Sequence, residues 1–228
     1  MPEKYVIIVA GGKGVRMGLD LPKQFMLLNG RPVLMHTIIA FYDYDPAMHI
    51  ILVLPAEHTV YWSQLCADYK FDIPHQIVTG GNTRFQSVRR GLEKVEKGAL
   101  VGVHDGVRPL IDRQLIAKIY ETAVAQKGAY PVIPLIDSIR ELDNEGESHP
   151  VDRSKYRLVQ TPQVFWSDII IDAYKQEYKD VFTDDVSVVE ALKEYPVYEV
   201  EGSKENIKIT TPIDLIIAEK LIIPNSGY

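Results

Sequence analysis

An α/β fold is predicted from the sequence: a Rossmann-like, mostly parallel open sheet with helices on both faces and a protruding β-hairpin arm. Three observations support this prediction. Short β-branched runs alternate with stretches of helical periodicity, the two clearest strands are apolar throughout, and one long polar segment interrupts the alternation. Fully apolar strands that alternate with helices are typical of parallel sheets joined by right-handed crossovers.

The elements up to residue 134 follow from these patterns. The first strand is predicted at residues 5–10, which form the longest apolar run, and another at residues 50–54, which end before Pro55. Apolar residues at helical spacing, or further β-branched runs, predict the other elements. We expect helices at residues 34–42, 57–69, 84–97 and 113–126, and strands at residues 75–78, 99–104 and 129–134.

Residues 137–159 interrupt this order. They are polar and contain the turn signal Asp143-Asn144-Glu145-Gly146 between two extended flanks, which predicts a hairpin that projects from the domain. An isolated two-stranded ribbon is only marginally stable in water, so we expect the hairpin to contact another surface, such as the same hairpin of a second subunit. A mobile surface loop is the alternative.

Beyond the hairpin, helices are expected at residues 168–178, 184–194 and 211–221, and an extended segment at residues 197–201. Thr211 supplies an N-cap for the last helix, and Pro212 is its first residue. Lys208 is expected on a short apolar strand, and on its own it is typical of a surface residue. Because no repeat or linker divides the chain, residues 1–228 are predicted to form a single domain whose arm spans about residues 137–159.

The composition excludes several classes of protein. The chain has 228 residues, a formal net charge of −6, 46% hydrophobic and 25% charged residues, which are ordinary proportions for a globular protein. Its mild acidity argues against a broad nucleic-acid-binding surface. The longest apolar run, six residues, falls far short of the roughly 18 that a membrane span needs. We see no signal-peptide pattern, and the single Cys66 fits a reducing compartment, so a cytoplasmic location is expected.

The strongest local signal directly follows the first strand, where residues 10–18 read AGGKGVRMG. Glycines let the backbone approach a triphosphate and present successive N–H groups to its oxygens. Arg16 and Lys23 add positive charge within reach of the same place. The spacing is not that of a Walker A motif, and Met17 stands at the third glycine position of a dinucleotide fingerprint. The pattern favours a triphosphate-binding loop, with a purely structural turn as the alternative.

Two further clusters stand at predicted strand ends, where open α/β sheets bind ligands. In the GGNTR segment at residues 80–84, the glycines suit close approach to a nucleoside, and Asn82 and the nearby Ser87 could bond a base or ribose. A capped helix start is the alternative there. Asp105 and Arg108 follow the strand expected at residues 99–104, and together they could hold a metal-triphosphate and a second anion, or form a structural ion pair.

Taken together, these pieces resemble one family, the cytidylyltransferases that activate polyol phosphates, and most closely those that act on 2-C-methyl-D-erythritol 4-phosphate. The resemblance runs from residue 6 to about residue 221 and rests on the ordered motifs AGGKGVRMG, LPKQF, GGNTRFQSV, VHDGVRP, DS, VDR, QTPQVF, TDD and NIKITTP. It implies transfer of CMP from CTP to the polyol phosphate with release of pyrophosphate. It also implies Mg²⁺ held mainly by the CTP phosphates, and a homodimer formed through the hairpin arm.

The resemblance further implies the residues of the site. Catalytic roles fall to Arg16, Lys23 and Lys208. The CTP site would comprise Ala10, Gly11, Gly12, Gly14, Arg16, Lys23, Gly81, Asn82, Ser87 and Gly106. The polyol phosphate would be bound by Asp105, Arg108, Ser138, Arg153, Thr161, Thr183 and Lys208, with Arg153 reaching the substrate of the neighbouring subunit. No protein metal ligand is expected.

Alternatives to this function remain at the level of sequence. The Ala10-Gly11-Gly12 form is shared with D-ribitol-5-phosphate cytidylyltransferases, whereas Ser87 and the VDR and TDD motifs favour the methylerythritol enzymes. A nicotinamide-dependent oxidoreductase would fit a Gly-rich turn but requires the third glycine that is missing. A nucleotide sensor without catalytic activity would have no need to keep all three of the basic residues assigned to catalysis.

Overall fold

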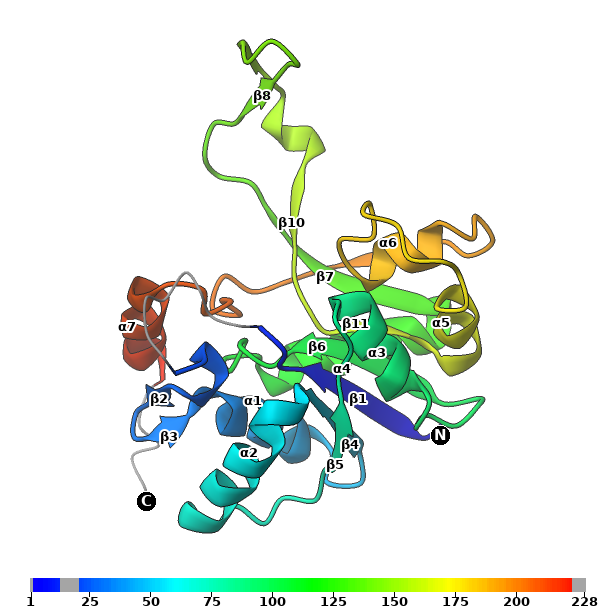
Figure 1. Ribbon diagram of the computed structural model, residues 1–228. Coiled ribbons are helices and arrows are strands. Elements are labelled where there is room, and N and C mark those ends of the chain that lie inside the picture. Colours follow the sequence, from blue (N-terminus) through cyan, green and yellow to red (C-terminus); the bar gives the residue numbers. More distant parts are fainter. Residues whose placement is uncertain (1, 13–20, 223–228) are drawn as a thin grey trace.

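The computed structural model describes residues 2–12 and 21–222, and its centre is an eight-stranded sheet (Figure 1). The strands lie in the order β10-β7-β11-β6-β1-β4-β5, and β12 also pairs with β7. They are β1 (Lys4–Val9), β4 (His49–Leu54), β5 (Gln76–Thr79), β6 (Leu100–Asp105), β7 (Gly128–Pro134), β10 (Arg157–Val159), β11 (Gln163–Trp166) and β12 (Tyr198–Glu201). The predicted open, mostly parallel sheet with helices is therefore confirmed.

Helices surround this sheet, and short elements connect them. The helices are α1 (Val33–Tyr44), α2 (Ala56–Asp68), α3 (Arg84–Leu92), α4 (Arg113–Gln126), α5 (Ser167–Ala173), α6 (Asp185–Glu190) and α7 (Pro212–Leu221). The short elements are the 3₁₀ turns η2 (Lys23–Phe25) and η3 (Arg153–Lys155) and the strands β2 (Leu27–Leu28), β3 (Arg31–Pro32), β8 (Arg140–Leu142) and β9 (Ser148–Pro150). In the described part of the chain, every helix is too short or too polar to cross a lipid bilayer.

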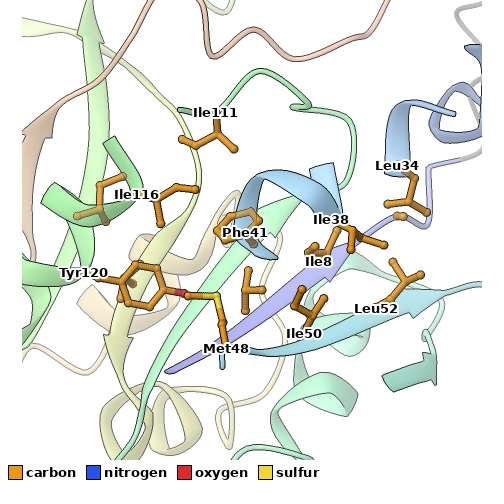
Figure 2. Close-up of a cluster of buried hydrophobic side chains, with 14 of the residues drawn as sticks. Ile8, Leu34, Ile38, Phe41, Met48, Ile50, Leu52, Ile111, Ile116 and Tyr120 are labelled. Atoms are coloured by element: carbon orange, nitrogen blue, oxygen red, sulfur yellow. The ribbon is translucent and has the colours of Figure 1, made fainter. Parts of the chain in front are cut away.

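Alternation along β1 divides the core into two layers. Val6 and Ile8 are fully buried against α1, α2 and α4, a layer that Figure 2 shows around Ile8, Ile38 and Phe41. Tyr5 and Ile7 point to the opposite face, which α3, α5 and α6 cover. Because strand side chains alternate between faces, a run that is apolar at every position places the strand between two layers of helices.

The parallel strands bring four carboxyl ends to one edge of the sheet. β1 pairs in parallel with β4 on one side and β6 on the other, and β4 pairs in parallel with β5. Val9 at the end of β1 is in register with Val53 and with Asp105. The loops that follow these strands therefore start side by side, which is where ligands bind in open α/β sheets.

Three predicted helices end earlier than expected. The helices predicted at residues 84–97, 168–178 and 184–194 end at Leu92, Ala173 and Glu190. After α3 the backbone continues as a turn, in which the Val95 N–H donates to the Leu92 carbonyl at 3.1 Å. Val95 is nevertheless buried in the same core layer as α3. Apolar residues at helical spacing thus continue beyond the end of α3, so the sequence pattern overestimated the length of this helix.

Two features of the sheet differ from the prediction. β11 had not been predicted, yet it lies inside the sheet and pairs antiparallel with both β6 and β7. It is four residues long and begins with the buried polar Gln163, so its apolar run is only three residues. The strand predicted around Lys208 was wrong: the segment is irregular, and the Ile209 N–H donates to the Val107 carbonyl at 2.9 Å.

The polar segment after β7 extends away from the body of the molecule (Figure 1). β8 and β9 pair antiparallel, with Leu142 opposite Ser148. Oδ1 of Asp143 accepts the N–H groups of Glu145 and Glu147, each at 2.9 Å, and so orders the turn between them. The last three residues of the predicted arm form β10, which belongs to the main sheet, so the projecting part ends before residue 157. Its part in dimerisation stays a prediction.

Candidate active site

A cavity of about 290 Å³ lies at the carboxyl ends of β5, β4, β1 and β6. It brings together the loop after β1, the start of η2, the GGN loop at residues 80–82 and the end of β6. The predicted site residues that line it are Ala10, Gly11, Gly12, Lys23, Gly81, Asn82, Ser87, Asp105 and Lys208. A Cβ atom on Gly12 would lie 3.6 Å from Cε of Lys23, so the glycine loop and the lysine are neighbours. We call this the nucleotide cavity.

A second cavity of about 250 Å³ is lined by β6, the β10–β11 connection and the residues before α6. The predicted acceptor-binding residues that line it are Asp105, Arg108, Thr161, Thr183 and Lys208. Three side chains, those of Arg84, Asp105 and Lys208, line both cavities. The two cavities therefore meet at these side chains, and we call the second one the acceptor cavity.

Some residues assigned to CTP lie elsewhere. Gly14 and Arg16 are outside the described residues, so their predicted roles stay predictions. Gly106 directly follows Asp105, but the described lining of neither cavity includes it. A Cβ atom there would come within 2.9 Å of the Cβ of Ala10. Glycine at this position thus allows β6 to approach the loop after β1 closely.

Two residues assigned to the acceptor lie on the arm. Ser138 and Arg153 are exposed, and neither is among the described residues that line the two cavities. Nη1 of Arg153 donates to the carbonyl of Ile136, and its side chain lines a separate groove with Glu199 and Glu201. One subunit by itself therefore does not bring these two residues to the site.

The GGN loop is held by the first turn of α3. Oγ1 of Thr83 accepts the Gln86 N–H at 3.1 Å and caps the helix, so the helix-cap interpretation is correct for this residue. Oε1 of Gln86 accepts the Asn82 N–H at 2.8 Å, and the hydroxyl of Ser87 accepts the Gly81 N–H at 3.1 Å. A Cβ on Gly81 would lie 2.4 Å from the Cβ of Gln86, so glycine is required here. These contacts, all within the protein, fix the loop on α3.

Lys23 is positioned by the two residues that follow it. Nε2 of the buried Gln24 donates to the Ala10 carbonyl at 2.9 Å, which joins η2 to the loop after β1. The ring of Phe25 is buried against α2, with its centroid 5.1 Å from that of Tyr61 in an edge contact. These contacts hold the backbone of Lys23 between the glycine loop and α2.

Asp105 is the electrostatic centre of the site. Its Oδ2 lies 3.0 Å from Nζ of Lys208 and 3.2 Å from Nε of Arg108. Burial by itself would raise the pKa of Asp105, but Lys208, Arg84 and Arg108 outweigh burial and hold that pKa well below its usual range. Nη1 of Arg108 also donates to the carbonyl of Asn206 at 2.8 Å, which anchors the segment that carries Lys208. The carboxylate is thus charged and orients two cations.

A buried histidine fixes the backbone of Asp105. Nε2 of His104 lies 3.1 Å from the carbonyl oxygen of Arg108, which can only accept, so this nitrogen carries the hydrogen. Nδ1 then accepts from the Thr161 hydroxyl at 3.0 Å, and Oγ1 of Thr161 accepts the Asp105 N–H at 3.1 Å. Burial lowers the pKa of His104 to about 4, so the ring is neutral at neutral pH. Thr161 therefore supports Asp105 as well as lining the acceptor cavity.

Arg84 and Asp185 are functional candidates that the sequence did not identify. Arg84 lines both cavities, and its guanidinium donates twice to the fully buried Asp185 carboxylate, at 3.0 and 2.6 Å. The two residues stand in the motifs GGNTRFQSV and TDD, which could have marked them. Their pairing spans 101 positions and appears only once the chain is folded.

The chain is similar to proteins of one family. The model of the family described as 2-C-methyl-D-erythritol 4-phosphate cytidylyltransferase matches residues 5–223. Proteins of that name from Azobacteroides pseudotrichonymphae and Phocaeicola vulgatus are each 55% identical, over 97% and 96% of this chain and 100% of their own length. The crystal structure of the Thermus thermophilus protein of that name has a TM-score of 0.76 at 33% identity, covering 97% of this chain and 98% of that one. A structure of 4-diphosphocytidyl-2C-methyl-D-erythritol synthase from Anaerococcus prevotii gives a TM-score of 0.81 at 28% identity, over 96% of this chain and 95% of that one.

Proposed function

The chain belongs to the 2-C-methyl-D-erythritol 4-phosphate cytidylyltransferase family, and we propose that its two cavities hold the two substrates of the reaction. The enzyme transfers CMP from CTP to 2-C-methyl-D-erythritol 4-phosphate, giving 4-diphosphocytidyl-2-C-methyl-D-erythritol and pyrophosphate, a step of non-mevalonate isoprenoid biosynthesis. The comparisons do not favour D-ribitol 5-phosphate as the acceptor, and family membership argues against an oxidoreductase or a nucleotide sensor.

The assignment of the two cavities depends on one observation, which is that they share part of their lining. The nucleotide cavity contains the glycine loop and Lys23, which suit a triphosphate, and the GGN loop, which suits a nucleoside. The acceptor cavity contains hydroxyl groups and Arg108, which suit a polyol phosphate. Since Asp105 and Lys208 line both, a phosphate in each cavity would come close to the same Nζ of Lys208.

The reaction then needs alignment and charge stabilisation. A phosphate oxygen of the acceptor attacks the α-phosphorus of CTP, the new P–O bond forms, and the bond to the β-phosphate oxygen breaks with pyrophosphate as the leaving group. The acceptor phosphate is already ionised, so no protein base or covalent intermediate is needed. Lys208 would stabilise charge at the reacting phosphates, while Lys23 and Arg16 would stabilise it on the triphosphate. Asp105 would orient Lys208 through their 3.0 Å contact.

Nucleotide choice tests the assignment of the GGN loop. We expect kcat/KM for CTP to exceed the values for UTP and ATP by about 10² or more, because a base edge that mismatches hydrogen-bonding groups leaves them unpaired. Pyrophosphate release with saturating 2-C-methyl-D-erythritol 4-phosphate measures the three values. Comparable values for all three nucleotides would contradict the role given to Gly81 and Asn82. Absence of release with CTP would contradict the activity itself.

Mg²⁺ fits this site as a companion of the nucleotide. Among the described residues, no three His, Cys, Asp or Glu side chains gather to hold a metal. Asp105, an oxygen donor in the lining of the nucleotide cavity, is engaged by Lys208 and Arg108. Mg²⁺ is commonly bound by substrate phosphates and water with few protein ligands, and triphosphate oxygens would be its main ligands here. When bound, it would add positive charge to the triphosphate.

A homodimer through the arm would explain two features of that segment. The arm and its base carry large apolar side chains that are at least two-fifths exposed, namely Ile136, Leu142, Tyr156, Leu158 and Val159. Exposed apolar groups gathered on one segment are typical of an interface. The second feature is Arg153, whose bidentate guanidinium suits a phosphate but lines neither cavity of its own subunit among the described residues. In a dimer it would reach the acceptor of the partner.

Complementation between two inactive variants tests this arrangement. Mixing Arg153→Ala protomers with Lys23→Ala protomers should restore activity, because each heterodimer then contains one site with both residues. Random reassortment makes half the dimers heterodimers, so recovery should approach about a quarter of wild-type activity per subunit in a closed two-fold dimer. Pyrophosphate release before and after subunit exchange measures it. If exchange is confirmed by mass and the mixture is no more active than its parents, Arg153 does not act on the partner's site.

A cytoplasmic location is part of the same proposal. Cys66, the single cysteine of the chain, has no partner for an internal disulfide, and free thiols are typical of a reducing compartment. Burial also raises the pKa of its thiol to about 11, so it is not a reactive thiolate at neutral pH.

A further inference from the structure

Arg84 occupies the boundary between the two cavities. It is the first residue of α3 and directly follows the helix cap Thr83, so its backbone is fixed together with the GGN loop. Its side chain lines both cavities, as do those of Asp105 and Lys208. A group at this place can contact a phosphate in the acceptor cavity while being fixed by the nucleotide-binding helix.

The guanidinium of Arg84 is held in place by two hydrogen bonds to the carboxylate of Asp185. Nη1 donates to Oδ1 at 3.0 Å and Nη2 to Oδ2 at 2.6 Å, a bidentate pair that fixes the plane of the guanidinium. Asp185 is 0% exposed and also accepts from the hydroxyl of Tyr174 at 2.5 Å, whereas the Arg84 side chain is 31% exposed. The ring of Tyr174 stacks on that of Phe85, with centroids 4.6 Å apart. The carboxylate is therefore rigid, and the exposed part of the pair is the cation.

The charges around the boundary favour an anion. The described charged residues that line the two cavities, counted together with the Asp185 partner of Arg84, leave an excess of one positive charge: the four cations are Lys23, Arg84, Arg108 and Lys208, and the three carboxylates are Asp105, Asp184 and Asp185. Within the described residues, the Arg84 guanidinium donates two hydrogen bonds, both to Asp185, out of the five N–H donors that an arginine carries. Arginine is well suited to bind phosphate with the remaining donors.

We propose that Arg84 binds the phosphate of the acceptor where the two cavities meet, and that Asp185 is the residue that positions it. This inference rests on the proposed function, because it assigns the anion at that place to 2-C-methyl-D-erythritol 4-phosphate. Arg84 then orients the attacking phosphate from the side of α3, and Lys208 contacts it from the opposite segment of the chain. A purely structural ion pair between α3 and α6 is the competing explanation.

Steady-state kinetics separate the two explanations. Arg84→Lys keeps the charge but loses the bidentate fork, so it should lower kcat/KM for the acceptor by about 30–100-fold and leave KM for CTP within about threefold. Asp185→Asn should lower the same acceptor parameter by about tenfold, and the double variant should be little worse than Arg84→Lys alone, because both act through one group. Arg89 is exposed on the same helix and lines neither described cavity, so the control variant Arg89→Lys should keep the wild-type kinetic parameters for both substrates.

A binding measurement tests the contact between Arg84 and the acceptor without relying on turnover, so it also applies to a variant with little activity. With a CTP analogue whose α,β-bridging oxygen is replaced by methylene, the acceptor should raise the melting temperature of the wild-type complex and of Arg89→Lys. It should have little effect on Arg84→Lys, although the analogue still raises the melting temperature of that variant. Equal losses of CTP and acceptor parameters, or unchanged acceptor parameters with reduced thermal stability, would overturn the proposal. A wild-type enzyme that releases no pyrophosphate would instead overturn the proposed function.

Discussion

Replacing Lys23 or Lys208 by alanine should lower kcat by about 10²–10³, the loss expected when one preorganised group that stabilises transition-state charge is removed. Lys23 lines the nucleotide cavity beside Gly12, and Lys208 lines both cavities and contacts Asp105 at 3.0 Å. In the proposed arrangement of the substrates, both lysines would lie where negative charge increases as pyrophosphate leaves.

The measurement is single-turnover or steady-state pyrophosphate release with both substrates saturating. Lys204→Ala is the matched control for Lys208, because Lys204 is exposed on the same segment and lines neither described cavity. It should keep wild-type turnover. If both active-site variants fold normally and turn over near the wild-type rate, the charges assigned to these lysines are wrong.

The backbone architecture could be predicted where local pattern and tertiary role agree. After their first residues, Lys4 and His49, β1 and β4 are apolar because helices cover both faces, so their burial was visible in the sequence. The start of α7 was predicted from Thr211 and Pro212, and the structure shows the expected cap and the proline in the first turn. β11 was missed because its neighbours β6 and β7 stabilise it, and four residues with a buried glutamine at one end carry too little pattern of their own.

The site could be predicted as a set of segments but not as a geometry. Glycine loops and basic residues at strand ends indicated where to expect a ligand site, and the fold brings Lys23, Asp105 and Lys208 to one cavity. The ion pair between Arg84 and Asp185 could not be predicted, because the two residues are 101 positions apart and their pairing depends on how α6 is placed relative to α3. The contacts of Ser87 could not be predicted either. Its hydroxyl accepts the Gly81 N–H and donates to the Thr83 carbonyl.

Acceptor choice is the second large effect that we expect. The acceptor cavity is about 250 Å³ and is lined by the hydroxyls of Thr161 and Thr183 and by the apolar side chain of Val159. 2-C-Methyl-D-erythritol 4-phosphate has a four-carbon chain with a methyl branch, whereas D-ribitol 5-phosphate has an unbranched five-carbon chain and one more hydroxyl. A cavity that matches the methylerythritol phosphate would leave polar groups of the ribitol phosphate without hydrogen-bond partners. Sites built from hydrogen bonds discriminate strongly against such a mismatch.

Competition between the two acceptors tests the central claim most directly. The enzyme is given CTP and equal concentrations of both polyol phosphates, and the two cytidylylated products are separated by mass while pyrophosphate is counted. We expect the methylerythritol product to exceed the ribitol product by about 10² or more, with one pyrophosphate released per product. Equal amounts of the two products, a majority of the ribitol product, or pyrophosphate released without either product would contradict the account.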